Sequence, residues 1–275
     1  MITDKHTVEE AYKIARRDGI GPMIIAGLRY FGISLIGYYY YLNYKYQYYK
    51  GNACEPYDVF RTIFVDPKEV QYSIMGTFDK WKHMGQIRNG DWDLTDNQFT
   101  ERALVTALFE RFEEDRDWSD IAWVQNAIEA VNTGKSTWNG CRSAEDVEDR
   151  CVSVDELFRQ IRTEGFKSQS EIHKADIKSI LLSGSFDRSK TDIAVAIGRN
   201  GEFLFIDGNH RLAIAHMLNL DQIPVRVVVR HEMWQEIREE IRFSDDFNQL
   251  SERTKNHIDH PDVQNLVSES LSLSQ

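Results

Sequence analysis

The residues best suited to chemistry stand together in one short turn, Asp207-Gly208-Asn209-His210-Arg211, between an apolar stretch and a helix-forming stretch. The first backbone N–H groups of a helix have no partner within the helix and attract anions, and a glycine lets the backbone approach a ligand closely. An arginine can bind phosphate oxygens in pairs, and a carboxylate oxygen is the kind of ligand that Mg²⁺ prefers. The turn therefore predicts a phosphate site in which Gly208, Asn209, His210 and Arg211 bind phosphate and Asp207 holds Mg²⁺.

A structural interpretation of the same turn stays open from the sequence. Units of a glycine turn followed by a helix are common in proteins that bind no phosphate. His210 and Arg211 could cap the helix and bridge to acidic neighbours, and Asp207 could form a turn through its own side chain.

Transfer of a phosphoryl group would also need a base that orients the attacking hydroxyl. Asp91 and Asp93 flank a tryptophan in a loop bounded by glycine, and in an extended chain both carboxylates would point the same way. Glu171 is a third candidate. Asp207 and His210 complete the candidate catalytic set, with His210 neutralising developing charge. The alternative interpretation is that Asp91 and Asp93 lie in a solvated acidic turn and that Glu171 is a solvated residue on a helix.

Arg230 and His231 are further candidates for phosphate binding. They directly follow an apolar strand-like stretch, so they could face the same cleft as the turn. A histidine at the end of a strand also has a plain structural role, and the sequence does not separate the two.

The elements that must position these residues follow from periodicity and turn signals. We expect strands over 61–65, 193–197, 202–206 and 225–229, and helices over 99–112, 118–131, 210–218 and 234–243. Ser153 and Glu156 form a capping-box pattern for one more helix, which Gly165 ends. Helices followed by a compact unit of strands and helices predict a mixed α+β fold with a small sheet.

Composition limits the partners. The chain of 275 residues has 33 basic and 44 acidic side chains, a net charge of 33 − 44 = −11. Nonspecific nucleic-acid binding needs a basic surface, so a small phosphate ligand is the expected partner and nucleic acid is not. The three cysteines show no paired spacing and the first ten residues are polar, which is typical of a cytoplasmic protein.

One apolar stretch, residues 20–42, has the length of a membrane span, but Arg29 lies in its middle. The tyrosine-rich residues that follow favour an interface over a hydrocarbon core. We therefore expect residues 20–50 to form a helix packed on the main domain, with a membrane-surface or protein contact as the alternative.

The sequence Asp207-Gly208-Asn209-His210-Arg211-Leu212, with the alanine-rich stretch after it and Ile223-Pro224-Val225, resembles the signature of the ParB/sulfiredoxin superfamily. Residues 62–70 resemble the first strand of that fold, and residues 157–180 resemble its helix and turn. The resemblance implies three parts. These are a helical, tyrosine-rich segment at 1–55, a ParB/sulfiredoxin-like domain at 56–243 with a helical insertion at about 95–150, and a polar C-terminal tail at 244–275.

The resemblance also implies nucleotide binding, with ATP, ADP or CTP as the ligand and Mg²⁺ as the metal. The turn is most similar to that of the free-serine-kinase-like branch, which implies a phosphotransferase acting on a small hydroxyl-bearing metabolite or sugar. Sulfiredoxins carry a cysteine in the turn where this chain has Asn209. Two alternatives are kept: a DNA-associated ParB-like protein, either nuclease or CTP-dependent clamp, and a non-catalytic adaptor that docks on a membrane or a partner.

Overall fold

The computed structural model describes most of the chain from residue 62 onward. The described ranges are 62–74, 83–138, 140–167, 192–244 and 246–271, together with residues 76, 78 and 80 and five residues between 42 and 49. The predicted N-terminal segment at 1–55 lies outside the described residues apart from those five, and Glu171 lies outside them too.

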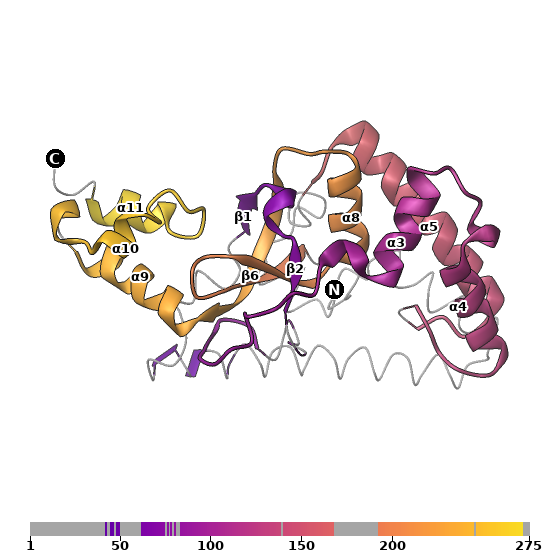
Figure 1. Ribbon diagram of the computed structural model, residues 1–275, viewed down its shortest axis with the longest axis horizontal. Helices are drawn as coiled ribbons and strands as arrows, with labels where there is room; N and C mark the ends of the chain where they lie inside the picture. Colours follow the sequence, from indigo (N-terminus) through magenta and orange to yellow (C-terminus); the bar gives the residue numbers. More distant parts are fainter. Residues whose placement is uncertain are drawn as a thin grey trace, which may run out of the picture.

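Six strands of the described part form one mixed sheet at the centre of the molecule (Figure 1). The strand order is β1-β6-β4-β5-β2, and β3 pairs with the far end of β6. The β1–β6 and β4–β5 pairs are antiparallel, and the β6–β4, β5–β2 and β3–β6 pairs are parallel. The strands are β1 (Thr62–Val65), β2 (Tyr72–Ser73), β3 (Gln86–Arg88), β4 (Ile193–Ile197), β5 (Phe203–Asp207) and β6 (Ile223–His231).

Helices flank the sheet on both sides in Figure 1. One group holds α3 (Ala103–Phe112), α4 (Ala122–Asn132), α5 (Ala144–Glu164) and α8 (Asn209–Met217). The other group holds α9 (Glu232–Phe243), α10 (Glu252–Lys255) and α11 (Gln264–Leu271). Short 3₁₀ turns are η1 (Pro67–Glu69), η2 (Phe99–Glu101), η3 (Trp118–Asp120) and η5 (Phe247–Gln249). The predicted mixed α+β class is confirmed.

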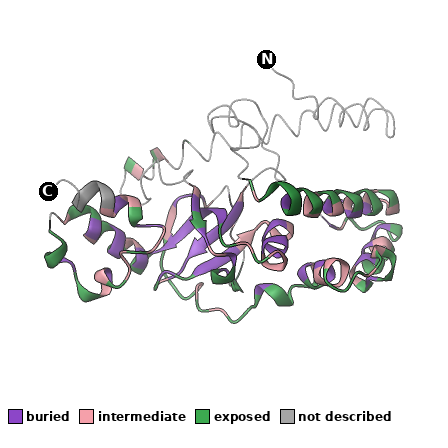
Figure 2. Ribbon diagram, turned by 90° about the horizontal axis from the view of Figure 1, so that it is seen from above, coloured by how far each residue is buried: buried purple, intermediate pink, exposed green. Residues whose placement is uncertain are grey.

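The central strand β6 organises the fold, because it pairs with three other strands and all nine of its residues are buried. The sheet appears as the buried centre of Figure 2. The predicted strand at 225–229 is too short, since β6 begins before Pro224 and ends at His231. Charged Arg226 and Arg230 lie within it, and both are buried.

Alternate residues of the strands serve two different buried clusters, as expected when successive side chains point to opposite faces. Ile193, Val195 and Ile197 of β4 pack with Leu212 and Ala213 of α8. The other cluster contains the alternate residues of the same strand and its neighbours, namely Ala194, Ala196, Leu204 and Val228, with Phe78 and Trp92 packed against them. The sheet therefore has apolar cover on both faces.

The helix predicted to begin after Ser153 starts ten residues earlier. The capping box is formed by Ser143 and Asp146, which exchange side-chain and backbone hydrogen bonds. The Ser153 hydroxyl instead donates to the Asp149 carbonyl inside α5. Residue 150, the predicted end of the helical insertion, therefore lies within α5, which runs unbroken to Glu164. Its predicted end at Gly165 is confirmed, with the glycine at φ +81°.

The region predicted as a polar tail contains folded structure. Its helices α10 and α11 pack against α9, and Asp262 between them is fully buried. The boundary at residue 243 marks the end of α9 and not the end of the packed chain.

Candidate functional site

The turn between β5 and α8 has the geometry that the sequence predicts. Gly208 has φ +105°, a conformation that side chains rarely adopt, and a Cβ there would lie 3.2 Å from the Ile193 backbone. The close approach to β4 and the positive φ both explain why glycine is needed at this position. The turn carries the chain from the end of β5 directly into the first residue of α8, Asn209.

The start of α8 is without a side-chain cap. Gly208 occupies the capping position and offers no side-chain oxygen to the first N–H groups. The amide oxygen of Asn209 is sealed from solvent and has no hydrogen-bond partner in the part of the chain that the structure describes. The N-terminus of α8 therefore keeps a partial positive charge.

Asp207 is surrounded by cationic side chains. Its Oδ2 lies 2.6 Å from Nζ of Lys80, which is 6% exposed, and its Oδ1 accepts from the N–H of Gly208 at 2.8 Å. Burial lowers the pKa of the guanidinium groups of Arg102 and Arg226. The negative charge of Asp207 opposes this effect on Arg102, and the charges of Asp192 and Asp207 oppose it on Arg226. Lys80 thus forms an ion pair with Asp207, and the two arginines interact with its charge.

His210 is a neutral side chain in this structure. Nε1 of Trp138 donates to Nε2 of His210 at 3.1 Å, and the two rings stack with centroids 6.0 Å apart. Burial and the nearby charge of Arg150 lower the pKa of His210 to about 4, with Asp207 acting in the opposite direction. His210 therefore does not supply the positive charge that the sequence interpretation gives it.

The guanidinium of Arg211 is engaged by contacts within the protein. Its guanidinium lies 3.5 Å from the Asp192 carboxylate, donates to the carbonyl of Lys167 and covers the ring of Phe166 at 4.3 Å. These contacts join the start of α8 to the end of α5. The predicted direct contact between Arg211 and phosphate would require them to break.

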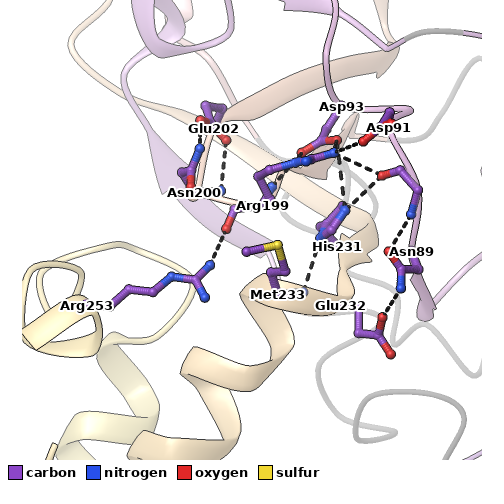
Figure 3. Close-up of polar contacts among 11 residues, drawn as sticks. Asn89, Asp91, Asp93, Arg199, Asn200, Glu202, His231, Glu232, Met233 and Arg253 are labelled. Carbon is purple, nitrogen blue, oxygen red and sulfur yellow. Dashed lines mark hydrogen bonds and ion pairs between the residues drawn. The ribbon is translucent and has the colours of Figure 1, made fainter. Parts of the chain in front are cut away.

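The candidate bases Asp91 and Asp93 are bound by Arg199, as Figure 3 shows. Arg199 donates to Asp93 through Nε at 2.9 Å, Nη2 at 2.8 Å and its backbone N–H at 2.8 Å, and Nη2 also reaches Asp91 at 2.7 Å. Burial raises the pKa of Asp93, but the hydrogen bonds from Arg199 outweigh it and the pKa lies below its usual range. A carboxylate held in this way is a poor base near neutral pH.

His231 lies in the same cluster (Figure 3). Its Nε2 lies 2.9 Å from the Gly90 carbonyl, and its Nδ1 accepts from the N–H of Met233 at 3.1 Å as the cap of α9. A carbonyl accepts and an amide donates, so these partners assign a neutral ring with its proton on Nε2. His231 thereby fixes the 89–93 loop to the start of α9.

Arg230 belongs to a separate buried cluster. It binds both carboxylate oxygens of Asp262, at 2.9 Å from Nε and 2.6 Å from Nη2. Arg238 and Trp234 also donate to Asp262, at 2.8 and 3.0 Å. The contacts shown for this arginine are those of a buried ion pair.

The structure places the predicted site residues in two groups at opposite ends of β4. Asp207 and Arg226 are both paired with Ala194, near the beginning of β4, whereas Arg230 is paired with Ile197 at its end. The three-residue step between these positions spans about 10 Å. Arg230, His231, Asp91 and Asp93 therefore do not share one cleft with the α8 turn.

The sequence interpretation missed the residues that surround the turn. Arg226 carried a usable signal, because a charged residue inside the apolar run VRVVV is unusual in a buried strand. Lys80, Arg102, Trp138 and Arg199 carried none, since each is brought to its partner by tertiary packing over long sequence distances.

The metal assignment of Asp207 lacks support from its neighbours. The described residues contain no group of three or more histidine, cysteine, aspartate or glutamate side chains placed to hold a metal ion. The Asp207 carboxylate is itself engaged by Lys80 and by the backbone of Gly208. The donor set as it lies does not fit a protein-held Mg²⁺.

Comparison of the chain with protein-family models, with curated proteins and with solved structures found no match. Among the residues that the structure describes, no helix combines the length and apolar character needed to cross a bilayer. The resemblance to the ParB/sulfiredoxin superfamily and the expected localisation stay predictions.

Proposed function

We propose that the chain binds a phosphate-bearing small molecule, a nucleotide in the first place, at the turn between β5 and α8. One observation carries the proposal: several cationic side chains lie around an uncapped helix start. Lys80 pairs with Asp207 and Arg211 pairs with Asp192, and Arg102 and Arg226 interact with the charge of Asp207. Positive charge in a partly buried place favours an anionic ligand.

The groups that would bind the phosphate differ from those the sequence suggests. The N–H groups at the start of α8 supply the anion-binding end of a helix. Lys80 and Arg102 supply full charges beside them, and Asp207 keeps the lysine side chain in place. Arg211 acts by holding the end of α5 against the turn.

The proposed activity is transfer of a phosphoryl group from the nucleotide to a hydroxyl of a small metabolite or sugar. Such a reaction depends mainly on positioning and charge neutralisation, which a cation-rich helix start can provide. Asp93 is not proposed as the base, because Arg199 holds it in the other group of residues. Supplied Mg²⁺ would enter with the nucleotide phosphates, as is usual for this ion.

Titration calorimetry with ATP, ADP and CTP, each with and without Mg²⁺, tests the binding. Arg102 is suited to substitution because the residue is exposed to solvent although its guanidinium is partly covered, so Arg102→Gln should fold. We expect this variant to weaken nucleotide binding by roughly tenfold, as for loss of one charge-assisted hydrogen bond. Arg162→Gln, an exposed arginine of α5, is the matched control and should bind like the wild type.

The reaction is tested by following phosphate transfer with ³¹P NMR in the presence of pooled hydroxyl metabolites. Absence of saturable binding for all three nucleotides, or equal binding by Arg102→Gln and Arg162→Gln, would overturn the proposal. Salt-sensitive retention of DNA without nucleotide binding would instead favour the DNA-associated alternative.

A further inference from the structure

Trp138 and His210 form a contact between the helical insertion and the α8 turn. Trp138 lies in the connection between α4 and α5, and His210 is the second residue of α8. The indole N–H of Trp138 donates to Nε2 of His210 at 3.1 Å, and the ring planes are inclined by only 21°. Two parts of the chain separated by 72 positions thus meet at one imidazole.

This hydrogen bond decides where the imidazole carries its proton. Nε2 accepts, so in the neutral ring the proton lies on Nδ1 and makes this atom a donor. Among the described residues, no protein acceptor takes a hydrogen bond from Nδ1, and this atom is not completely sealed from solvent. Its N–H therefore stays available for a hydrogen bond beside the uncapped start of α8.

Trp138 is itself fixed from several sides. Its ring meets Trp123 edge to face with centroids 4.6 Å apart, and Trp118 lies 6.2 Å away. The side chain is buried, and its backbone has φ +39°, a conformation that bulky residues seldom adopt. The indole N–H thus has little freedom to turn away from His210.

Burial is the main reason that the His210 ring stays neutral, because it disfavours the charged form. The positive charge of Arg150, from α5, acts in the same direction, whereas the negative charge of Asp207, from β5, opposes it. Together these effects lower the pKa of His210 to about 4. A neutral ring with one fixed tautomer is present throughout the neutral pH range.

We propose that Trp138 is a positioning residue, which holds His210 as a neutral Nδ1–H donor to an anionic oxygen of the ligand bound at the start of α8. The inference rests on the proposed function and deepens it by naming how the helical insertion takes part in the site. The ligand oxygen accepts the hydrogen bond, and no proton is transferred.

Binding of inorganic pyrophosphate, the group that ATP, ADP and CTP share, tests the proposal in a double-mutant cycle. Trp138→Phe keeps an aromatic ring and removes the donor. We expect it to weaken binding about tenfold, the scale of one hydrogen bond to a charged group. Trp123→Phe makes the same substitution in the same aromatic cluster and should stay within about twofold of the wild type.

Replacement of His210 separates positioning from packing. Asparagine places its amide near the Nδ1 position, so His210→Asn should retain binding, whereas His210→Gln reaches the Nε2 position and should lose it. In the His210→Asn background Trp138→Phe should cost nothing further, because no tautomer remains to be fixed. Equal losses from Trp138→Phe in both backgrounds, or equal binding by the asparagine and glutamine variants, would overturn the proposal.

NMR of ¹⁵N-labelled histidine gives a readout that needs no ligand. We expect the Nδ1–H tautomer for His210 in the wild type and a mixture of tautomers in Trp138→Phe. An Nε2–H tautomer in the wild type would overturn the inference and leave nucleotide binding untouched. Nucleotide binding that fails while the Nδ1–H tautomer is present would overturn the proposed function, and with it the ligand contact.

Discussion

Arg230 and Asp262 form a two-point ion pair in which both side chains are almost completely buried. Nη2 and Nε of Arg230 lie 2.6 and 2.9 Å from the two carboxylate oxygens. Arg238 adds a second cation at 2.8 Å. The cluster joins the end of the central strand β6 to α9 and to the segment before α11, so it attaches the C-terminal helices to the sheet.

We expect Asp262→Asn to destabilise the protein by about 3–5 kcal/mol, because it removes the negative charge that two buried guanidinium groups contact. Denaturant unfolding measures the change. Asp259→Asn, at an exposed position of the same segment, should change the free energy of unfolding by less than about 0.5 kcal/mol. Equal stability of the two variants would contradict a structural role for the buried pair.

Acid should weaken the same cluster. Burial raises the pKa of the Asp262 carboxyl, but Arg230 and Arg238 lower it well below its usual range. A carboxyl with a lowered pKa in the folded state stabilises the protein above its unfolded pKa, about 4, and loses that contribution as the pH falls further. Unfolding measured from pH 6 to pH 3 should therefore show a steeper loss for the wild type than for Asp262→Asn.

Asp93 and Asp91 provide a matched pair of carboxylates. Both bind Arg199, but the side chain of Asp93 is 2% exposed and that of Asp91 is 78% exposed. Asp93→Asn should lower the free energy of unfolding by about 2–3 kcal/mol, and Asp91→Asn by less than about 1 kcal/mol. If the two formed a catalytic pair, both substitutions would remove activity and leave the stability unchanged.

Local patterns in the sequence are enough to predict the strands on either side of residues 199–201 and the α8 turn. Arg199-Asn200-Gly201 joins two β-branched and aromatic runs, and β4 and β5 pair as a hairpin there. A glycine between a strand-like and a helix-like stretch predicts a turn, and the structure has this turn at Gly208, with a positive φ. In both cases the information lies within a few residues of the feature.

The start of α5 and the partners of the candidate site residues depend on tertiary contacts, which local sequence patterns do not contain. Ser143 and Ser153 each begin a capping pattern, and the choice of Ser143 is consistent with the burial of Val147 and Cys151 along the earlier turns of α5. The candidate site was misjudged for the same reason. Asp93 was a candidate base, but it binds Arg199, which is 106 positions away in the sequence, and so belongs to a cluster of ion pairs.

The two described cysteines should be unreactive. Burial and the charge of Asp155 raise the pKa of Cys151 to about 12, and burial also raises the pKa of Cys141. Thiolate is the reactive form, so iodoacetamide at pH 8 should leave both unlabelled in the folded protein and label both in urea. Peptide mass spectrometry gives the result for each cysteine, and rapid labelling of either in the folded protein would contradict the expectation.

The stability of the protein should depend on the pH through His210. The pKa of its side chain is lowered to about 4 in the folded protein, whereas an unfolded histidine has a pKa near 6.5. Between these two pH values His210 is protonated in the unfolded chain but not in the folded protein. Its contribution to the free energy of unfolding is therefore complete above about pH 6.5 and is lost as the pH falls towards 4. The difference corresponds to about 3 kcal/mol at most.

Comparison of the wild type with His210→Asn isolates this effect, because asparagine does not titrate. Other groups also titrate in this range, but their contributions to the pH dependence cancel in the comparison. We expect the free energies of unfolding of the two proteins to diverge as the pH rises from 4.5 to 7, with the wild type gaining more. Parallel pH profiles would show that the folded protein protonates His210 as readily as the unfolded chain does.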